Sequence, residues 1–490
     1  MFREPEMLLV GRPSATTDLL DYRFRRILLV ALFPYPVLLA FSLLSGCSWE
    51  FVGLHAALFC MVVVYFALCK DHSLTLFVAT HSFWLFSYSL LMYAVLHQVP
   101  PDRYLIDPIR SSLITVVYLC GCICARLLSG HVPIPSSAVR TPASSRVSHA
   151  LCYLGLLFIP ARVVFGSESF WYAISAAFTQ LYWLGLYLRF ERGRFRFADP
   201  LLLAGVALCL IVSVVDNRRA LMFELCFTFV LIYLRTSIYP FSPPRILLAA
   251  VGSVYFARFS DIFLYARIFV GRERPAELLN FVVGGIFSAS FLLAPLGTSD
   301  TYIREALESY VSPYSNYRIA MFEGRSGISE RATLLPQMDA VVGVLPEPDT
   351  VDWGEISNTL LTLLPSFGQD KDQNFGDRLT WRTGLRPAGI VGHPLITAAG
   401  EFFAMGGYLV LFAFTVINFL IFFIELKLLI RLLGSQSVAI MFAFNQAFYM
   451  MFTSTAISAT AVVLRQIPFL VVIYLATKFV VTQGDRGQVR

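Results

Sequence analysis

Residues 402–424, FFAMGGYLVLFAFTVINFLIFFI, hold no charged side chain. A helix of about 20 apolar residues crosses the roughly 30 Å hydrocarbon core of a bilayer. Because backbone groups in lipid must be paired within their own segment, this stretch predicts a transmembrane helix. Similar runs recur along the 490-residue chain, which is 57% hydrophobic and 14% charged. Soluble domains carry roughly 25% charged residues, so we interpret the chain as an all-α polytopic membrane protein.

Apolar runs of this kind predict about twelve transmembrane helices. They cover residues 27–45, 51–69, 74–96, 112–128, 149–165, 170–188, 200–215, 220–234, 246–263, 402–424, 437–457 and 462–481. The segment 281–297 is also apolar, but it is short and rich in Gly and Ser. It is interpreted either as a thirteenth span or as a re-entrant or interfacial piece.

The distribution of basic residues decides between these readings. Cytoplasmic connections carry an excess of Lys and Arg. Basic residues lie in the N-terminal tail and in alternate connections, at Lys70, Arg126, Arg189 and Arg235, and again at Lys427 and Lys478 near the C-terminus. All of them lie inside only if 281–297 does not cross. We therefore predict that both termini are cytoplasmic.

The resulting organisation has five parts. Residues 1–26 form a cytoplasmic tail, and 27–263 form an N-terminal bundle of about nine helices. Residues 264–400 form an outer, periplasmic loop that includes 281–297, 401–482 form the C-terminal helices, and 483–490 form a second tail. The stretch from Leu296 to Gly400 is polar, and all nine cysteines lie between Cys47 and Cys226. No disulfide framework supports this stretch, which we interpret as a lid of helices and loops.

The outer turn Asp216-Asn-Arg218-Arg219 joins two predicted spans. An arginine at mid-depth in a bilayer costs roughly 2.5–3.5 kcal/mol, so it normally has a partner or a purpose. One interpretation is a helical hairpin whose arginines snorkel to the surface. The other is a clamp for a lipid-linked pyrophosphate, because guanidinium groups bind phosphate through two parallel hydrogen bonds.

The polar segment ends in a second basic group, Arg378-Leu-Thr-Trp381-Arg382-Thr-Gly-Leu-Arg386, followed by His393. Three arginines at four-residue spacing share one face of a helix. Trp381 lies among them and offers a ring on which a sugar can stack. His393 is the only histidine in the polar segment, and it has either a structural role or a role in the site.

Glu401 opens the predicted span that follows. A carboxylate in the first turn is stabilised by the helix dipole, which explains Glu401 without any function. The alternative is a base or an orienting acid at the outer edge of the membrane, beside His393. Arg318, in Ser315-Asn-Tyr-Arg318, is a further candidate contact for phosphate or sugar.

Several classes of chemistry have no support in the sequence. No Walker, H-E-x-x-H or G-x-S-x-G motif occurs, so ATP-driven transport, zinc proteolysis and serine hydrolysis have no motif behind them. Asp370-Lys-Asp372 is best explained as a solvated loop, and no metal or other cofactor is predicted. The arginines are dispersed among hydrophobic spans, so a nucleic-acid partner is not expected.

The pattern Gly389…Pro394…Gly400-Glu401-Phe402…Gly406-Gly407, which closes a late outer loop and enters an apolar helix, resembles the Wzy family. These proteins are the O-antigen and oligosaccharide repeat-unit polymerases of the bacterial inner membrane. The Asp216–Arg219 turn is similar to the arginine-containing outer turn of that family. The interval from Arg378 to Gly389 also resembles its spacing of an arginine, ten residues and a glycine. The resemblance implies a multi-pass fold of the GT-C-like, polymerase–ligase type with one large outer loop.

The resemblance also implies a reaction. A growing glycan on undecaprenyl pyrophosphate would be transferred at the periplasmic face to a second lipid-linked repeat unit. Glu401 or His393 would activate the acceptor hydroxyl, and Arg218, Arg219, Arg318, Arg378 and Arg382, with Trp381, would bind pyrophosphate and sugar. The expected partners are the lipid-linked oligosaccharide, membrane lipid and a chain-length regulator protein. An O-antigen ligase, or a polysaccharide flippase or other transporter without catalysis, remains the alternative.

Overall fold

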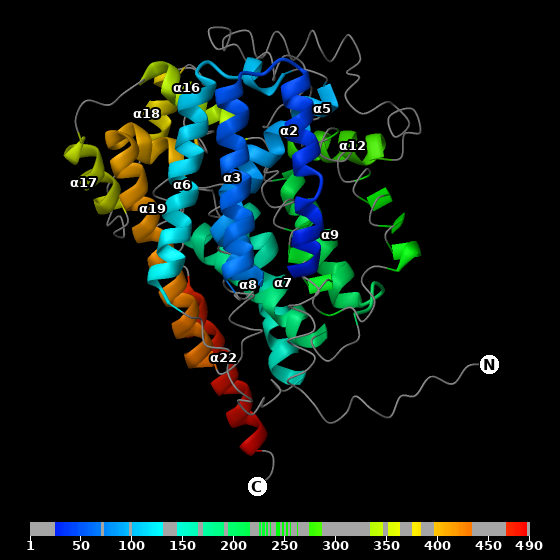
Figure 1. Ribbon diagram of the computed structural model, residues 1–490. Coiled ribbons are helices and arrows are strands. Elements are labelled where there is room, and N and C mark those ends of the chain that lie inside the picture. The colour runs from blue at the N-terminus through cyan, green and yellow to red at the C-terminus, as the bar shows by residue number, and fades with distance from the viewer. Residues whose placement is uncertain are drawn as a thin grey trace.

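The computed structural model describes residues 25–69, 73–97, 100–130, 145–164, 170–190, 195–215, 274–286, 334–345, 351–362, 375–383, 396–433 and 467–487, with single residues and short pieces between 225 and 262. Every regular element among these residues is a helix (Figure 1). The prediction of an all-α fold is therefore confirmed over the described ranges.

The first half of the chain forms α2 (Tyr35–Leu44), α3 (Trp49–Leu68), α4 (Ser73–Ser82), the π-helix η1 (Phe83–Tyr88), α5 (Ser89–His97), η2 (Pro101–Tyr104), α6 (Pro108–Leu128), α7 (Ser145–Val164), α8 (Phe170–Phe190) and α9 (Pro200–Val215). The second half forms α12 (Pro275–Ile286), α16 (Leu335–Val344), α17 (Trp353–Thr362), α18 (Phe375–Arg382), α19 (Ala398–Leu433) and α22 (Ile467–Gly487).

Five of the described helices are long and apolar enough to cross a membrane. They are Arg25–Leu44, Trp49–Leu68, Thr75–Met92, Pro108–Leu128 and Ala398–Arg431. Shorter apolar helices cover Arg146–Ala161, Pro200–Val215, Ala276–Gly285 and Ile467–Gln483. All of them except Ala276–Gly285 fall on predicted spans, and that helix overlaps the ambiguous segment 281–297. This supports a membrane protein, while the count of twelve stays a prediction.

The ambiguous segment 281–297 is described only as far as residue 286. There α12 has 12 residues, which gives a length of about 18 Å at 1.5 Å per residue. That length is shorter than the hydrocarbon core, so α12 by itself does not span a bilayer.

Close contacts between helices depend on small residues. A Cβ added at Gly155 of α7 would lie 2.2 Å from the Cβ of Tyr182 on α8, and one at Gly121 of α6 would lie 2.9 Å from the Cβ of Thr415 on α19. In both helix pairs, α7–α8 and α6–α19, the backbone at the glycine lies so close to the neighbouring helix that an added Cβ would overlap it. Small residues at such interfaces are typical of helices that associate in lipid, where no water is expelled on contact.

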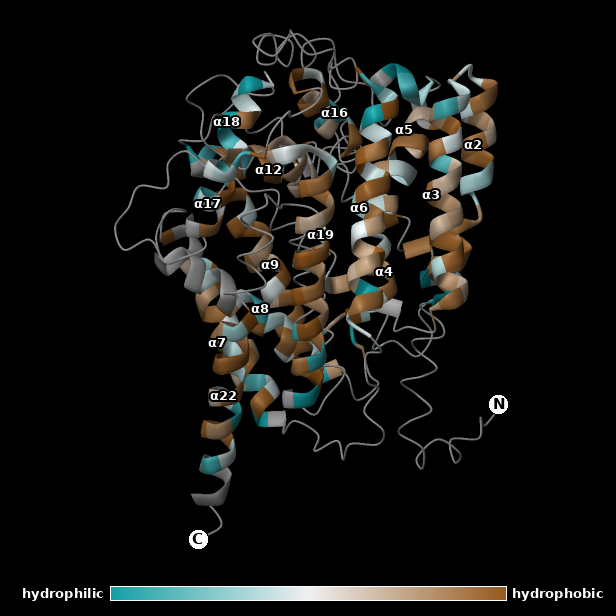
Figure 2. Cartoon of the chain, turned by 60° about the vertical axis from the view of Figure 1, so that its left-hand side comes forward, coloured by the Kyte–Doolittle hydropathy of each residue, from teal (hydrophilic) through white to brown (hydrophobic). Residues whose placement is uncertain are grey.

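The described helices give the bundle two distinct ends (Figure 1). The helices α16, α17 and α18 gather at one end, whereas α22 runs to the opposite end. Coloured by hydropathy, α3, α6 and α19 are largely apolar along their length, and hydrophilic residues appear on α17 and α18 (Figure 2). The described part of the polar segment thus caps one end of an apolar bundle.

At the end opposite α16–α18, basic side chains cap the C-termini of α3 and α6. Arg25 donates to the carbonyl of Phe66 in the last turn of α3. Arg126, in the last turn of α6, donates to the carbonyl of Gly130 over 2.6 Å, and Lys427 of α19 donates to the carbonyl of Ser129. Cations at helix C-termini satisfy carbonyls that have no intrahelical partner and interact well with the helix dipole.

Candidate functional site

A break in α19 organises the candidate site. Gly406 has φ 167° and ψ 36°, and Gly407 has φ 68° and ψ −158°. The conformation of Gly407 is open essentially to glycine alone. The break divides α19 into a short half that begins at Ala398 and a long half that ends at Leu433. The long half alone is ample to span a bilayer, and the short half belongs to the capped end of the bundle.

A separate part of the chain completes the broken helix. The amide of Asp352 donates to the carbonyl of Met405 over 2.8 Å. A Cβ at Gly406 would lie 3.3 Å from the Cα of Val351, so the glycine makes room for this approach. In the membrane, irregular backbone is tolerated only where protein or water satisfies it. The segment 351–352, which leads into α17, performs that task here.

Glu401 lies on the short half of α19 and is fully buried, with 0% of its surface exposed. Its neighbour Gly400 packs against α16, because a Cβ at Gly400 would lie 3.4 Å from Val341 and 3.8 Å from Met338. The sequence correctly assigned Glu401 to the first turn of a helix. Its enclosure by another part of the outer segment was not predicted.

The second predicted group is partly described in α18. Arg378 forms an ion pair with Glu355 of α17, and the Arg378 side chain keeps 37% of its surface exposed. Trp381 is half-buried and Arg382 is exposed. Both α17 and α18 pack against α19. The helix ends at Arg382, so the predicted arginine face is described for Arg378 and Arg382 and not for Arg386, which lies outside the described residues.

Four predicted site residues also lie outside the described ranges. They are Arg218, Arg219, Arg318 and His393. Among the predicted residues, the structure therefore brings Glu401, Arg378, Trp381 and Arg382 to the same end of the bundle. It gives Arg378 an acidic partner and leaves Arg382 as the more exposed guanidinium.

A buried carboxylate that was absent from the sequence prediction holds the same end together. Asp339 of α16 is 0% exposed. One of its oxygens accepts from the amide of Ile106, and the other accepts from the amide of Asp107 over 3.0 Å and from the hydroxyl of Ser111 over 2.6 Å. Asp339 thereby ties α16 to the loop before α6. The available signal was a single carboxylate within the otherwise uncharged run 334–345.

A second buried network surrounds His55 of α3. Its Nδ1 lies 2.5 Å from the hydroxyl of Ser87, and its Nε2 lies 3.1 Å from the hydroxyl of Ser112. Ser112 donates to the carbonyl of Pro108 over 2.6 Å, so it must accept from His55 Nε2. His55 Nε2 then carries a proton. The hydroxyl of Tyr35 bonds to Ser87 as well, so the network joins α2, α3, η1 and α6.

The π-helix that carries Ser87 frees a carbonyl for α16. The amide of Ser89 bonds to the carbonyl of Trp84, five residues back. In an α-helix it would bond to Leu85 instead. The carbonyl of Leu85 accepts from the Ser89 hydroxyl and, over 3.3 Å, from the amide of Leu334 just before α16. Single π-turns within α-helices often occur at functional sites.

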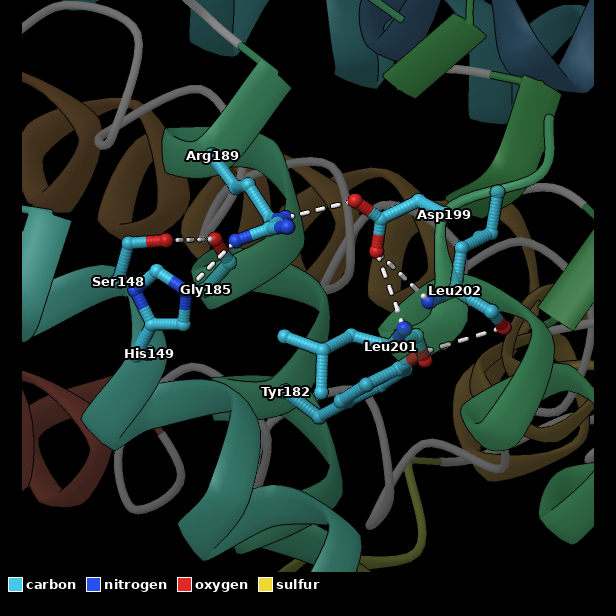
Figure 3. A network of polar contacts seen from close by, with 8 residues as sticks. All are labelled: Ser148, His149, Tyr182, Gly185, Arg189, Asp199, Leu201 and Leu202. Carbon is cyan, nitrogen blue, oxygen red and sulfur yellow. Dashed lines mark hydrogen bonds and ion pairs between the residues drawn. The ribbon is translucent and has the colours of Figure 1, made fainter. Parts of the chain in front are cut away.

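A third polar network joins α7, α8 and the start of α9 (Figure 3). Arg189 pairs with Asp199 over 2.8 Å and donates to His149 Nε2 over 2.6 Å. Asp199 also accepts from the amides of Leu201 and Leu202 over 3.0 and 3.3 Å, which makes it the N-cap of α9. All groups of this network have assigned partners, and we interpret it as structural.

The described residues contain no group of three or more His, Cys, Asp and Glu side chains arranged to hold a metal ion. What this end of the bundle offers is a buried carboxylate, an indole and two guanidinium groups beside a broken helix. Carboxylates transfer protons, and guanidinium groups bind phosphates.

The described fold is that of a helical membrane protein whose broken helix α19 packs against α16, α17 and α18. Searches for similar proteins found no matching family model, no matching curated protein and no matching solved structure.

Proposed function

We propose that this chain is a polysaccharide repeat-unit polymerase. It would transfer a growing glycan from undecaprenyl pyrophosphate to a lipid-linked repeat unit at the outer face of the bacterial inner membrane. The observation that carries the proposal is that α18, which holds Arg378, Trp381 and Arg382, packs against α19, which holds Glu401 and the break at Gly406 and Gly407. The resemblance to the Wzy family, drawn from the residues around Glu401 and Arg378, supports the same reaction.

The reaction forms a bond between the acceptor oxygen and the anomeric carbon of the donor glycan. It breaks the bond between that carbon and the pyrophosphate oxygen, and a base takes the acceptor proton. Pyrophosphate is already a good leaving group, so the chemistry needs charge stabilisation more than activation. Glu401 or His393 would be the base. Arg218, Arg219 and Arg318 would add further phosphate or sugar contacts.

The two described arginines would divide their work. Glu355 already neutralises part of the charge on Arg378, and this pairing orients the guanidinium group. Arg382 is exposed at the end of α18 and is the better candidate to meet an incoming phosphate. Trp381 lies between them in sequence and would contact a sugar.

The proposed topology has twelve spans with both termini in the cytoplasm. It is supported by Arg25, Arg126 and Lys427, which lie at the opposite end from α16–α18, because cytoplasmic ends carry the excess of basic residues. A reporter fused after Ser326 should be detected outside. Detection in the cytoplasm would overturn this topology and, with it, a periplasmic site.

Deletion of the gene and complementation with variants test the function. A strain without the polymerase should carry single repeat units on the final acceptor. Loss of a ligase would instead leave long chains on the lipid carrier, and loss of a flippase would strand units on the cytoplasmic side. A normal glycan ladder in the deletion strain rules out the proposal.

Three variants then test the assigned residues. Glu401→Gln, Arg382→Ala and Arg218→Ala should each leave single repeat units while the protein accumulates in the membrane at the wild-type level. Arg103→Ala is a matched control, since Arg103 is exposed on η2 and has no assigned role. Wild-type chain length in all three variants would contradict the site as assigned.

A further inference from the structure

The helix α16 is unusual for a segment that the sequence places in a polar lid. Eight successive residues, from Leu335 to Val342, are buried. A short helix at the surface would expose one side, so α16 is enclosed on all its faces from Leu335 to Val342, whereas Gly343 and Val344 at its end are exposed. It is a wedge inside the capped end of the bundle and not part of the cap surface.

Two polar anchors hold this wedge. At its start, the amide of Leu334 donates to the carbonyl of Leu85 that the π-helix makes available. In its middle, Asp339 accepts from the loop before α6 and from Ser111. Hydrogen bonds to an ionised acceptor are the stronger kind, so the contacts of Asp339 are the main anchor.

Polar contacts also connect the parts of α6 and η1 against which α16 packs. Ser111 bonds to Asp339, and the next residue, Ser112, bonds to His55. His55 in turn fixes Ser87 on the π-helix, which presents the second anchor point. Both anchors of α16 therefore depend on the first turns of α6 and on η1.

The opposite side of α16 contacts the candidate catalytic helix. Val341 and Met338 lie against the position of Gly400, where an added Cβ would be 3.4 and 3.8 Å from their side chains. Glu401 follows directly and is fully buried. A displacement of α16 would therefore reach the backbone that carries Glu401.

We propose that Asp339 is a positioning residue, which anchors α16 to the α6 end and thereby fixes the short half of α19 with Glu401. The catalytic role of Glu401 rests on the proposed function, whereas the anchoring of α16 by Asp339 does not. Asp339 is not assigned to the chemistry itself, because both of its oxygens accept hydrogen bonds from the protein. The wedge is a fixed wall of the site, and catalysis proceeds with α16 in place.

An engineered disulfide makes this proposal testable. A Cβ at position 343, near the end of α16, would lie 3.9 Å from the Cβ of Ile106. Disulfides need Cβ atoms roughly 3.5–4.5 Å apart. The pair Ile106→Cys and Gly343→Cys should therefore crosslink α16 to the same loop that Asp339 holds, independently of the carboxylate.

The crosslink can be read without removing the native cysteines. All nine lie between Cys47 and Cys226, so a protease site inserted after Ser326 separates them from position 343. Two fragments that migrate together without reductant and apart with it must be joined through the thiol introduced at position 343. This measurement uses the full-length protein in membranes and does not depend on glycan synthesis.

We expect four results. The double-cysteine variant crosslinks and keeps the wild-type glycan ladder. Asp339→Asn places the NH2 group of the new side chain against a group that donated a hydrogen bond to the carboxylate. This variant makes at least about tenfold less polymer, as expected from loss of a charged hydrogen bond. The disulfide restores polymer in the Asp339→Asn background, and reductant removes that rescue. Glu401→Gln is not rescued, because its defect is chemical.

Each contrary result has a distinct meaning. Failure to crosslink overturns the docked position of α16, whatever the function. A crosslink that forms and abolishes wild-type activity overturns the fixed wall. Normal activity of Asp339→Asn, or a crosslink that forms without rescue, overturns the positioning role. A normal glycan ladder after gene deletion refutes the proposed function but leaves the crosslinking result standing.

Discussion

Replacement of Gly407 by alanine is predicted to straighten α19. Gly407 has φ 68° and ψ −158°, and a side chain in such a region costs about 1–3 kcal/mol. Alanine also stabilises a continuous helix by about 1 kcal/mol relative to glycine. Both terms act in the same direction, so the broken form should lose about 2–4 kcal/mol against the continuous one.

The hydrogen bond at the break reports this change. In a continuous helix the Met405 carbonyl accepts from the amide of Leu409, four residues on. The amide of Asp352, now 2.8 Å from that carbonyl, would then lose its acceptor. A change of about 2–4 kcal/mol corresponds to a factor of about 30 to about 700 in the equilibrium between the two forms. Amide exchange at Asp352 should accelerate by up to that factor.

Hydrogen–deuterium exchange of the purified protein in lipid nanodiscs, followed on peptides that contain Asp352, measures the effect. Gly53→Ala is the matched control, because Gly53 lies within α3 and an added Cβ there meets nothing within 4 Å. It should leave exchange at Asp352 unchanged. Unchanged exchange in a folded Gly407→Ala variant would refute the reasoning that the left-handed glycine holds the break open.

Three further predictions concern the rest of the described bundle. Gly155→Ala should destabilise the protein by about 1–3 kcal/mol, because its Cβ would overlap Tyr182 and force α7 and α8 apart; unfolding in SDS–detergent mixtures measures it. Asp199→Ala should cost about 1 kcal/mol more than Asp199→Asn, because asparagine keeps the N-cap of α9 and both variants lose the ion pair with Arg189. Burial raises the pKa of Cys47 to about 12, so its alkylation at neutral pH should be slow and should rise about tenfold per pH unit below that value.

These predictions have internal controls. Gly53→Ala should be neutral or stabilising in the unfolding assay, since alanine improves a helix that has room for it. Equal stability of the two Asp199 variants would contradict the capping role. Arg103→Cys introduces a thiol at an exposed position near the same end of the bundle. Alkylation of Cys47 as fast as that thiol at pH 7 would contradict its burial.

Local features of the sequence were predictable because they depend on a single stretch of chain. The runs near 51–69 and 200–215 are helices in the structure because length and apolarity alone favour a helix in lipid. The start of α19 near Glu401 follows from the same local logic. The break at Gly406–Gly407 was not predicted as a break, since two glycines within an apolar run also fit a continuous transmembrane helix.

Contacts between distant segments account for what the sequence did not reveal. Burial of α16 depends on contact between Asp339 and the loop before α6, and Ile106 of that loop is 233 positions away from Asp339 in the sequence. The pairing of Arg378 with Glu355 likewise joins two helices that are separate in the sequence. A pattern read along one segment does not show which other segment supplies its partner.

The bond between Asp352 and Met405 has a consequence for biosynthesis. Because Asp352 precedes Met405 in the chain, the donor amide of Asp352 leaves the ribosome before α19, which carries the acceptor carbonyl of Met405. Asp352 has therefore already been made when α19 emerges, so the partner of the Met405 carbonyl is available while the helix folds. In a split version of the protein in which residues 398–490 are made before the remainder, the Met405 carbonyl would first lack this partner.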